Sequence, residues 1–122
     1  MNYHAHVYFK ASELQKAEEF FAQARAMAMG SAVLQVHKVF SKIVGPHALP
    51  MVELRFSDET KKEAIAWIDA HRKEWSVLIH QDSGNDVRDH SENVTWLGET
   101  LPIHFEFFKL IESSPDLLVH QL

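Results

Sequence analysis

The chain of 122 residues contains no cysteine. Disulfide bonds and thiolate metal sites are therefore excluded, and a reducing compartment is the natural location. No apolar run approaches the ~18 residues that are needed to span a bilayer, so no membrane partner is expected. The N-terminal residues lack the basic and apolar regions of a secretory signal. These absences together predict a cytoplasmic protein.

Positive charge is also scarce, with 12 lysines and arginines against 17 acidic residues and a net charge of -5. Proteins that bind nucleic acids normally carry a basic face, so no nucleic-acid partner is expected. Only four glycines and four prolines are present, and there is no repeat or linker. The length predicts one domain over residues 1–122, with a C-terminal extension over about 103–122.

Histidine, in contrast, is abundant, since nine histidines accompany only two tyrosines. Histidine is the commonest metal ligand and the side chain that titrates nearest neutral pH. The nine residues are spread along the chain rather than grouped in one run. Their positions within the predicted elements therefore decide whether they form a site.

Residue periodicity predicts alternating strands and helices. Period-two alternation predicts strands over 3–9, 33–41, 51–56 and 75–80, with a short one over 94–98. Helical spacing predicts one helix from Ser12, where Gln15 completes a capping box, to Gly30, and a second from Ser57 or Asp58 to about 73. A short docked helix is expected over 105–112, and turn formers dominate 81–93.

This order, βαββαβ, is typical of a ferredoxin-like α+β sandwich. Two split βαβ units form a four-stranded antiparallel sheet with both helices on one face. The usual strand order, 4-1-3-2, places the first strand in the middle of the sheet.

Strand parity then assigns the histidines to faces. Side chains alternate along a strand, so an apolar set including Ala5 and Val7 faces the helices, whereas His4 and His6 face the open side. Glu53 and His80 reach the same open face from the third and fourth strands. His90 lies on the following loop, while His47 is expected at the other end of the sheet.

Such a face can hold a metal ion. Two imidazoles and a carboxylate form the facial triad of non-haem iron(II) oxygenases, and three histidines suit zinc or iron. The alternative for the His4-x-His6 pair alone is two half-exposed polar residues on a solvated sheet. His71 is interpreted as a helix C-terminal cation, and His37, His104 and His120 as surface residues. Met51 and Leu78 on the open face predict burial by a homodimer.

Several motifs, in order along the chain, resemble the DOPA 4,5-dioxygenase family. They are residues 3–9 (YHAHVYF), 45–51 (GPHALPM), 76–80 (SVLIH), 83–86 (SGND), 89–90 (DH) and 96–102 (WLGETLP). The sequence departs from the family at Gln81, where proline is usual, and at Ser83, where threonine is usual. These departures bear on the substrate more than on the metal site.

The resemblance implies a ferredoxin-like fold, a homodimer with a barrel-like α/β assembly, and a small non-haem iron enzyme that opens a catechol ring with dioxygen. In the named reaction, DOPA gives a seco-DOPA that cyclises. The family's shared histidines correspond to His4, His6, His47, His80 and His90. Zinc or nickel could replace Fe(II) in the purified protein.

The expected roles follow from this resemblance. His6, His47 and His80 are the predicted metal ligands, with His47 supplied across a dimer, and His4 or His90 the acid–base group. The predicted substrate-binding residues are Glu53, which could instead be a metal ligand or orient one, Trp96 as a wall of the pocket and Glu99 as the partner of a substrate amine. The alternative is a non-catalytic dimeric binding protein whose histidines hold a small ligand or an adventitious metal.

Overall fold

A computed structural model describes residues 1–92 and 94–107 of the chain. Its sheet has five strands in the order β2-β3-β1-β4-β5, and every neighbouring pair is antiparallel. The strands are β1 (Asn2–Tyr8), β2 (Gln35–Phe40), β3 (Met51–Ser57), β4 (Val77–Gln81) and β5 (Thr95–Leu97). The α+β fold and the predicted order of the first four strands are confirmed, and β5 extends the sheet by one strand beyond β4.

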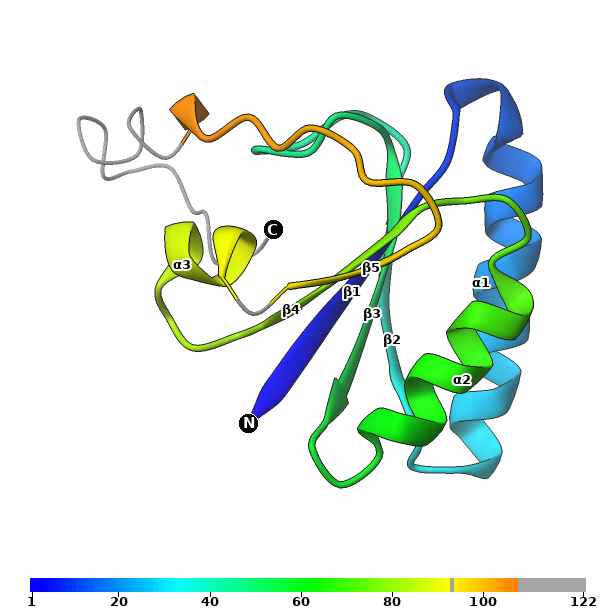
Figure 1. Cartoon of the computed structure of the whole chain (residues 1–122). Helices are drawn as coiled ribbons and strands as arrows, with labels where there is room; N and C mark the ends of the chain where they lie inside the picture. The colour runs from blue at the N-terminus through cyan, green and yellow to red at the C-terminus, as the bar shows by residue number, and fades with distance from the viewer. Residues whose placement is uncertain (93, 108–122) are drawn as a thin grey trace.

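Two helices cover one face of this sheet (Figure 1). They are α1 (Leu14–Gly30), which follows the short 3-10 turn η1 (Ala11–Glu13), and α2 (Lys61–His71). The predicted Ser12–Gln15 capping box is replaced by another contact, because the Lys10 amide donates to the Glu13 carboxylate at 3.2 Å. A short helix, α3 (Asp86–Ser91), lies on the opposite side of the sheet.

The predicted alternation in β1 places its two sets of side chains in different clusters. Ala5 and Val7 pack with the helices through Phe20, Ala24 and Ile68 in the main core. The other set includes Tyr8, which packs with Met51 and Leu78 in a second cluster on the opposite face. Since β1 is the central strand, residues of both clusters are deeply buried.

The face that sequence parity described as open is covered by the same chain. Val44 and Leu49, from the loop before β3, pack on the second cluster together with Trp96, Leu101 and Ile103. Figure 1 shows this loop and the segment after β5 on the side of the sheet away from α1 and α2. Met51 and Leu78 therefore need no partner chain for burial, and the homodimer and its barrel-like assembly stay predictions.

The helix α3 lies in the segment that was predicted to contain turns. The Asn85 side chain caps it by accepting from the Arg88 amide at 3.0 Å, and Asp86 and Asp89 occupy its first turn. Asparagine at the cap with acidic residues behind it is a helix-start signature. The predicted helix over 105–112 and most of the C-terminal extension lie outside the described residues. Within the described part, no helix is long and apolar enough to cross a membrane.

Candidate metal centre

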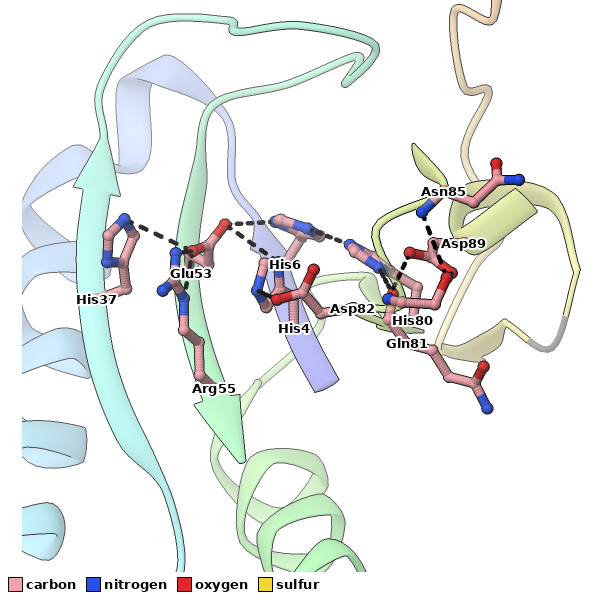
Figure 2. A network of polar contacts seen from close by, with 11 residues as sticks. His4, His6, His37, Glu53, Arg55, His80, Gln81, Asp82, Asn85 and Asp89 are labelled. Carbon is pink, nitrogen blue, oxygen red and sulfur yellow. Dashed lines mark hydrogen bonds and ion pairs between the residues drawn. The ribbon is translucent and has the colours of Figure 1, made fainter. Parts of the chain in front are cut away.

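Three histidines of the site come from adjacent strands. His4 pairs directly with His80 across β1 and β4, and His6 pairs with Glu53 across β1 and β3. The rings of His4 and His80 have centroids 5.2 Å apart, and those of His6 and His80 are 4.9 Å apart. The strand parity that grouped these residues on one face is thus reflected in their contacts (Figure 2).

His47 reaches the site from the loop before β3, within the same chain. Its ring centroid lies 4.4 Å from that of His6, and its Nδ1 atom is 2.7 Å from the Tyr8 hydroxyl. His47 lies at the Tyr8 end of β1, away from His4, as predicted, but it reaches the ring of His6 within its own chain, so no partner chain is needed to bring it to the site. The loop folds back over the sheet, and a hydrogen bond from the His104 amide to the Pro46 carbonyl (2.7 Å) fixes it there.

His90 is supplied by α3. Its ring lies 4.2 Å from that of His80 and 5.5 Å from that of His47, between centroids. The helix is tied to the end of β4 because Asp89, which is buried, accepts from the Ser83 hydroxyl at 2.6 Å and from the Ser83 amide at 2.8 Å. His90 was predicted to lie on a loop, but the structure places it on a helix that Asn85 caps.

Burial favours the neutral form of four of these imidazoles, those of His4, His6, His80 and His90. His4, His6, His47, His80 and His90 are each at most 4% exposed. Desolvation is the main cause that lowers the pKa of His80 to about 2 and of His4 to about 4, and it lowers those of His6 and His90 as well. Neighbouring histidines lower the pKa values of His6 and His80 further. A neutral imidazole has a lone pair available for a metal ion at neutral pH.

Hydrogen bonds to backbone carbonyls fix the tautomers of two rings. Nδ1 of His80 lies 2.7 Å from the Gln81 carbonyl, and Nδ1 of His90 lies 2.7 Å from the Asp86 carbonyl. A carbonyl only accepts, so in each neutral ring Nδ1 carries the proton and Nε2 carries the lone pair. Metal-bound histidines usually donate their other N–H to such an acceptor.

The distance between His6 and His80 fits a bound cation. Their Nε2 atoms are 2.8 Å apart, and two nitrogens at right angles around a metal, each ~2.0–2.1 Å from it, would lie about 2.9 Å apart. Two histidine groups, His4–His6–His80 and His6–His47–His90, have ligand atoms within 4.8 Å of one another. Buried histidines of this kind can hold a metal ion, and His6 belongs to both groups.

The buried carboxylate of Glu53 lies next to the histidine cluster, beside His6. Glu53 is fully buried, and its Oε2 atom accepts from Nε and Nη2 of Arg55 at 3.0 and 2.8 Å. Its Oε1 atom lies 3.6 Å from Nδ1 of His6, and Oε2 lies 3.6 Å from Nε2 of His37 (Figure 2). Burial raises the pKa of Glu53, and Arg55 opposes that shift. His37 is exposed, as predicted, yet it approaches the site from the point where the register of β2 against β3 shifts, between Val36 and Lys38.

Two cavities lie at opposite ends of β1, and a histidine lines the first of them. His4, Arg55 and Asp82 line one of about 240 Å³, in which Nε2 of His4 lies 3.3 Å from the Asp82 carboxylate. The other, of about 270 Å³, is lined by Tyr8, Leu49, Glu99 and Leu101. Tyr8 connects this second cavity to the metal centre, since its hydroxyl contacts His47.

The remaining candidates fall into different surroundings. Trp96 is half-buried on β5 and stacks on Tyr8 at 6.0 Å between ring centroids, whereas Glu99 is exposed at the second cavity. His71 ends α2 as predicted, stacked on Trp67 at 4.1 Å. The side chain of His104 is half exposed and pairs with Glu106, and His120 lies outside the described residues.

Three contributors were missed by the sequence analysis: Tyr8, Asp82 and Asp89. Tyr8 shares the parity of His4 and His6, so its face was predictable but its contact with His47 was not. Asp82 follows His80 by two residues and therefore shares its side of the chain. Asp89 adjoins His90 in a motif that the family resemblance had singled out, without a stated role.

Comparisons with known proteins extend this description. The chain is 26% identical over 107 residues to the DOPA 4,5-dioxygenase of Amanita muscaria, covering 84% of this chain and 47% of that protein. It is also 26% identical over 89 residues to an uncharacterized 21.2 kDa protein of Botryotinia fuckeliana, covering 66% and 49%. The chain thus spans about half the length of the curated relatives it matches.

A solved structure and a family model match more of the chain. The crystal structure of a "putative dioxygenase" from Nostoc punctiforme PCC 73102 has a TM-score of 0.74 and 28% sequence identity, covering 90% of this chain and 92% of that one. The model of the Dopa 4,5-dioxygenase family matches residues 3–107. This chain belongs to the Dopa 4,5-dioxygenase family.

Proposed function

We propose that this protein is an extradiol dioxygenase that opens the ring of a catechol such as DOPA with dioxygen at a non-haem Fe(II) ion. The observation that carries the proposal is the buried cluster of His6, His47, His80 and His90, in which neighbouring ring centroids lie 4.2 to 5.5 Å apart. Family membership supplies the class of reaction, and the neutral imidazoles supply ligands of the right kind.

His6 and His80 are the first ligands in this proposal, and His47 or His90 completes the set. Bound there, ferrous iron would supply the redox chemistry, lower the catechol pKa and bring catechol and dioxygen together. Burial lowers the pKa of His80 and of His90 and so keeps both rings neutral, and the carbonyls that accept from their Nδ1 atoms orient the rings. Zinc or nickel in the purified protein would occupy the same nitrogens.

His4 is assigned the proton transfer, in preference to His90. It lines the cavity at one end of β1, and its Nε2 atom lies 3.3 Å from Asp82, which is partly exposed. This geometry lets His4 pass a catechol proton to Asp82 and from there to solvent. His90 has its Nδ1 atom turned to the backbone instead, which suits a ligand.

The second cavity is assigned to the substrate's side chain. Trp96 and Tyr8 provide stacked aromatic surface beside it, and Glu99 provides an exposed carboxylate for an amine. The cavity of about 270 Å³ is a little below the ~300–1,000 Å³ of typical ligand pockets. A catechol with a short side chain matches this size better than a larger polyphenol.

The test is anaerobic reconstitution with Fe(II), followed by DOPA, caffeate or protocatechuate and then oxygen. A yellow ring-opened product that requires both iron and oxygen is expected from at least one of the three catechols. A protein that binds iron tightly but gives no product across the panel would contradict the dioxygenase. That result would favour the alternative, a non-catalytic binding protein with an adventitious metal.

A further inference from the structure

Glu53 presents its two carboxylate oxygens to chemically opposite neighbours. Oε2 accepts two hydrogen bonds from the Arg55 guanidinium, at 3.0 and 2.8 Å. Oε1 is turned toward the histidines and lies 3.6 Å from Nδ1 of His6. Among the described residues, Oε1 and this Nδ1 atom are both buried without a hydrogen-bond partner. A small movement would join them as donor and acceptor.

An ionised carboxylate only accepts hydrogen bonds, so it selects one form of the His6 ring. With Oε1 facing Nδ1, the proton of neutral His6 belongs on Nδ1, and the lone pair belongs on Nε2. That Nε2 atom is the one turned toward His80. The carboxylate therefore sets the chemical character of a nitrogen on the far side of the ring.

His80 meets this nitrogen with a lone pair of its own. Nδ1 of His80 donates to the Gln81 carbonyl at 2.7 Å, so its Nε2 atom carries no proton in the neutral ring. Two lone pairs then face each other across 2.8 Å. In these tautomers the two lone pairs repel one another unless a cation lies beside both nitrogens, whereas the other tautomer of His6 would donate from Nε2 to His80 and leave no lone pair for a metal.

We propose that Glu53 is a positioning residue that makes His6 bind the metal through Nε2. Arg55 holds Oε2, so that Oε1 is the carboxylate oxygen that faces His6. The inference rests on the metal site of the proposed function. It differs from the expectation that Glu53 binds substrate, because the carboxylate is fully buried behind the histidine rather than beside a cavity. Such carboxylate–histidine–metal arrangements hold ligand rings in orientation and raise their basicity.

The substitution Glu53→Gln reverses the selection without changing the size of the side chain. The guanidinium of Arg55 only donates, so it draws the amide oxygen to the position of Oε2. The amide NH2 group then faces Nδ1 of His6 and donates to it. The proton of His6 is pushed to Nε2, where it opposes metal binding.

The measurement is the affinity for Zn(II), taken by competition with a chromophoric chelator. Glu53→Gln should bind Zn(II) about 10–100-fold more weakly than the wild type, the usual effect of losing an outer partner of a ligand. Glu63→Gln is the matched control, because Glu63 is exposed on α2, and its Zn(II) affinity should equal that of the wild type. Circular dichroism and thermal unfolding establish that each variant is folded.

A second substitution separates this role from general support of the fold. In the Glu53→Gln background, Arg55→Met removes the donors that fix the amide, so the amide can turn its oxygen toward His6. Zn(II) affinity should then recover several-fold, although Arg55→Met alone should leave it equal or weaker. A loss of affinity that arises only from disrupted packing would grow, not shrink, in the double variant.

The wild-type protein provides a direct readout that needs no variant to fold. In a Zn(II)-loaded, ¹⁵N-histidine-labelled sample, NMR should place the remaining proton of His6 on Nδ1. The chemical shift of that proton should indicate that it donates a hydrogen bond. Coordination of His6 through Nδ1, or unchanged Zn(II) affinity in folded Glu53→Gln, would overturn the role of Glu53 alone. Wild-type protein that binds neither Zn(II) nor Fe(II) would overturn the metal site itself.

Discussion

The Nε2 atoms of His6 and His80 lie 2.8 Å apart, although the residues are 74 positions apart in the chain. This closeness makes a sharp prediction for metal binding. His80→Ala should lower the affinity for Zn(II) or Fe(II) by more than about 100-fold, a larger loss than outer partners cause. His104→Ala, which removes a half-exposed histidine, should leave the affinity unchanged. Equal metal content in the two variants after dialysis would contradict the assignment.

The metal-free protein should lose stability in mild acid. The unfolded chain protonates its histidines near pH 6.5, whereas burial holds the folded pKa of His4 at about 4 and of His80 at about 2. The stability that these neutral histidines contribute is therefore fully present above pH 6.5. It decreases below that pH, by up to about 1.4 kcal/mol per pH unit for each such histidine.

Urea unfolding in the presence of a chelator, between about pH 6.5 and 5.5, measures this slope. Burial raises the pKa of Glu53, so protonation of this carboxyl favours the folded state and opposes the effect of the histidines as the pH falls toward its titration range. The dependence of stability on pH is therefore clearest in the upper part of the interval. His4→Gln should flatten the slope. A stability that stays constant or rises over this interval would be incompatible with buried neutral imidazoles.

Substrate recognition should separate amines from acids at Glu99. If the exposed carboxylate pairs with the substrate ammonium, Glu99→Gln should raise KM for DOPA by about two- to fivefold, the effect of an interaction of about 0.5–1 kcal/mol. KM for caffeate, which carries no amine, should not change, and kcat should be retained for both. An equal change of KM for both catechols would place Glu99 outside amine recognition.

Gly98 tests the packing of the segment that follows β5. It adopts a positive φ of 75°, and a methyl group placed on it would lie 2.7 Å from Nη1 of Arg72. Gly98→Ala should lower the free energy of unfolding by about 1–2 kcal/mol, because L-residues are strained in this region. The displaced Arg72 would also lose its hydrogen bond to the Trp75 carbonyl, now 3.1 Å long.

Gly30→Ala is the matched control for this substitution. Gly30 ends α1, and no neighbour lies within 4 Å of the position that its methyl group would take. Alanine is the better helix former, so stability should be equal or slightly higher. Thermal unfolding of both variants, followed by circular dichroism, checks the pair; equal stability losses would contradict the backbone argument.

Residue alternation carried most of the fold prediction. The apolar and polar sets of β1 have different chemistry, so the pleat alone assigned His4 and His6 to one face and Val7 to the other. The strand order then followed from the βαββαβ order, and it placed His80 beside His4. These inferences depend on local geometry, which a single sequence contains.

The loop-borne parts of the site depend on contacts between distant segments. The sequence around His47 indicates a loop but no direction, and the direction is set by Tyr8 and by the backbone of His104. The same covering segments bury Met51 and Leu78, whose apparent exposure was one of two reasons for expecting a homodimer, the other being the family resemblance. Sedimentation velocity with and without Fe(II) would determine whether a dimer forms for another reason.

The central strand β1 contributes side chains both to the apolar core and to the histidine cluster. The fold and the site therefore depend on the same residues more strongly than they would if the site were built on loops. Shifting this strand by one residue against β3 would bring His4 and His6 into the apolar layer beneath the helices and turn Ala5 and Val7 toward the histidine cluster. A shift of one residue would therefore disrupt the apolar core and the histidine cluster together. Substitutions that reshape the two cavities can therefore accumulate in the surrounding loops, whereas residues 3–8 can change only in ways that preserve both the apolar core and the histidine cluster.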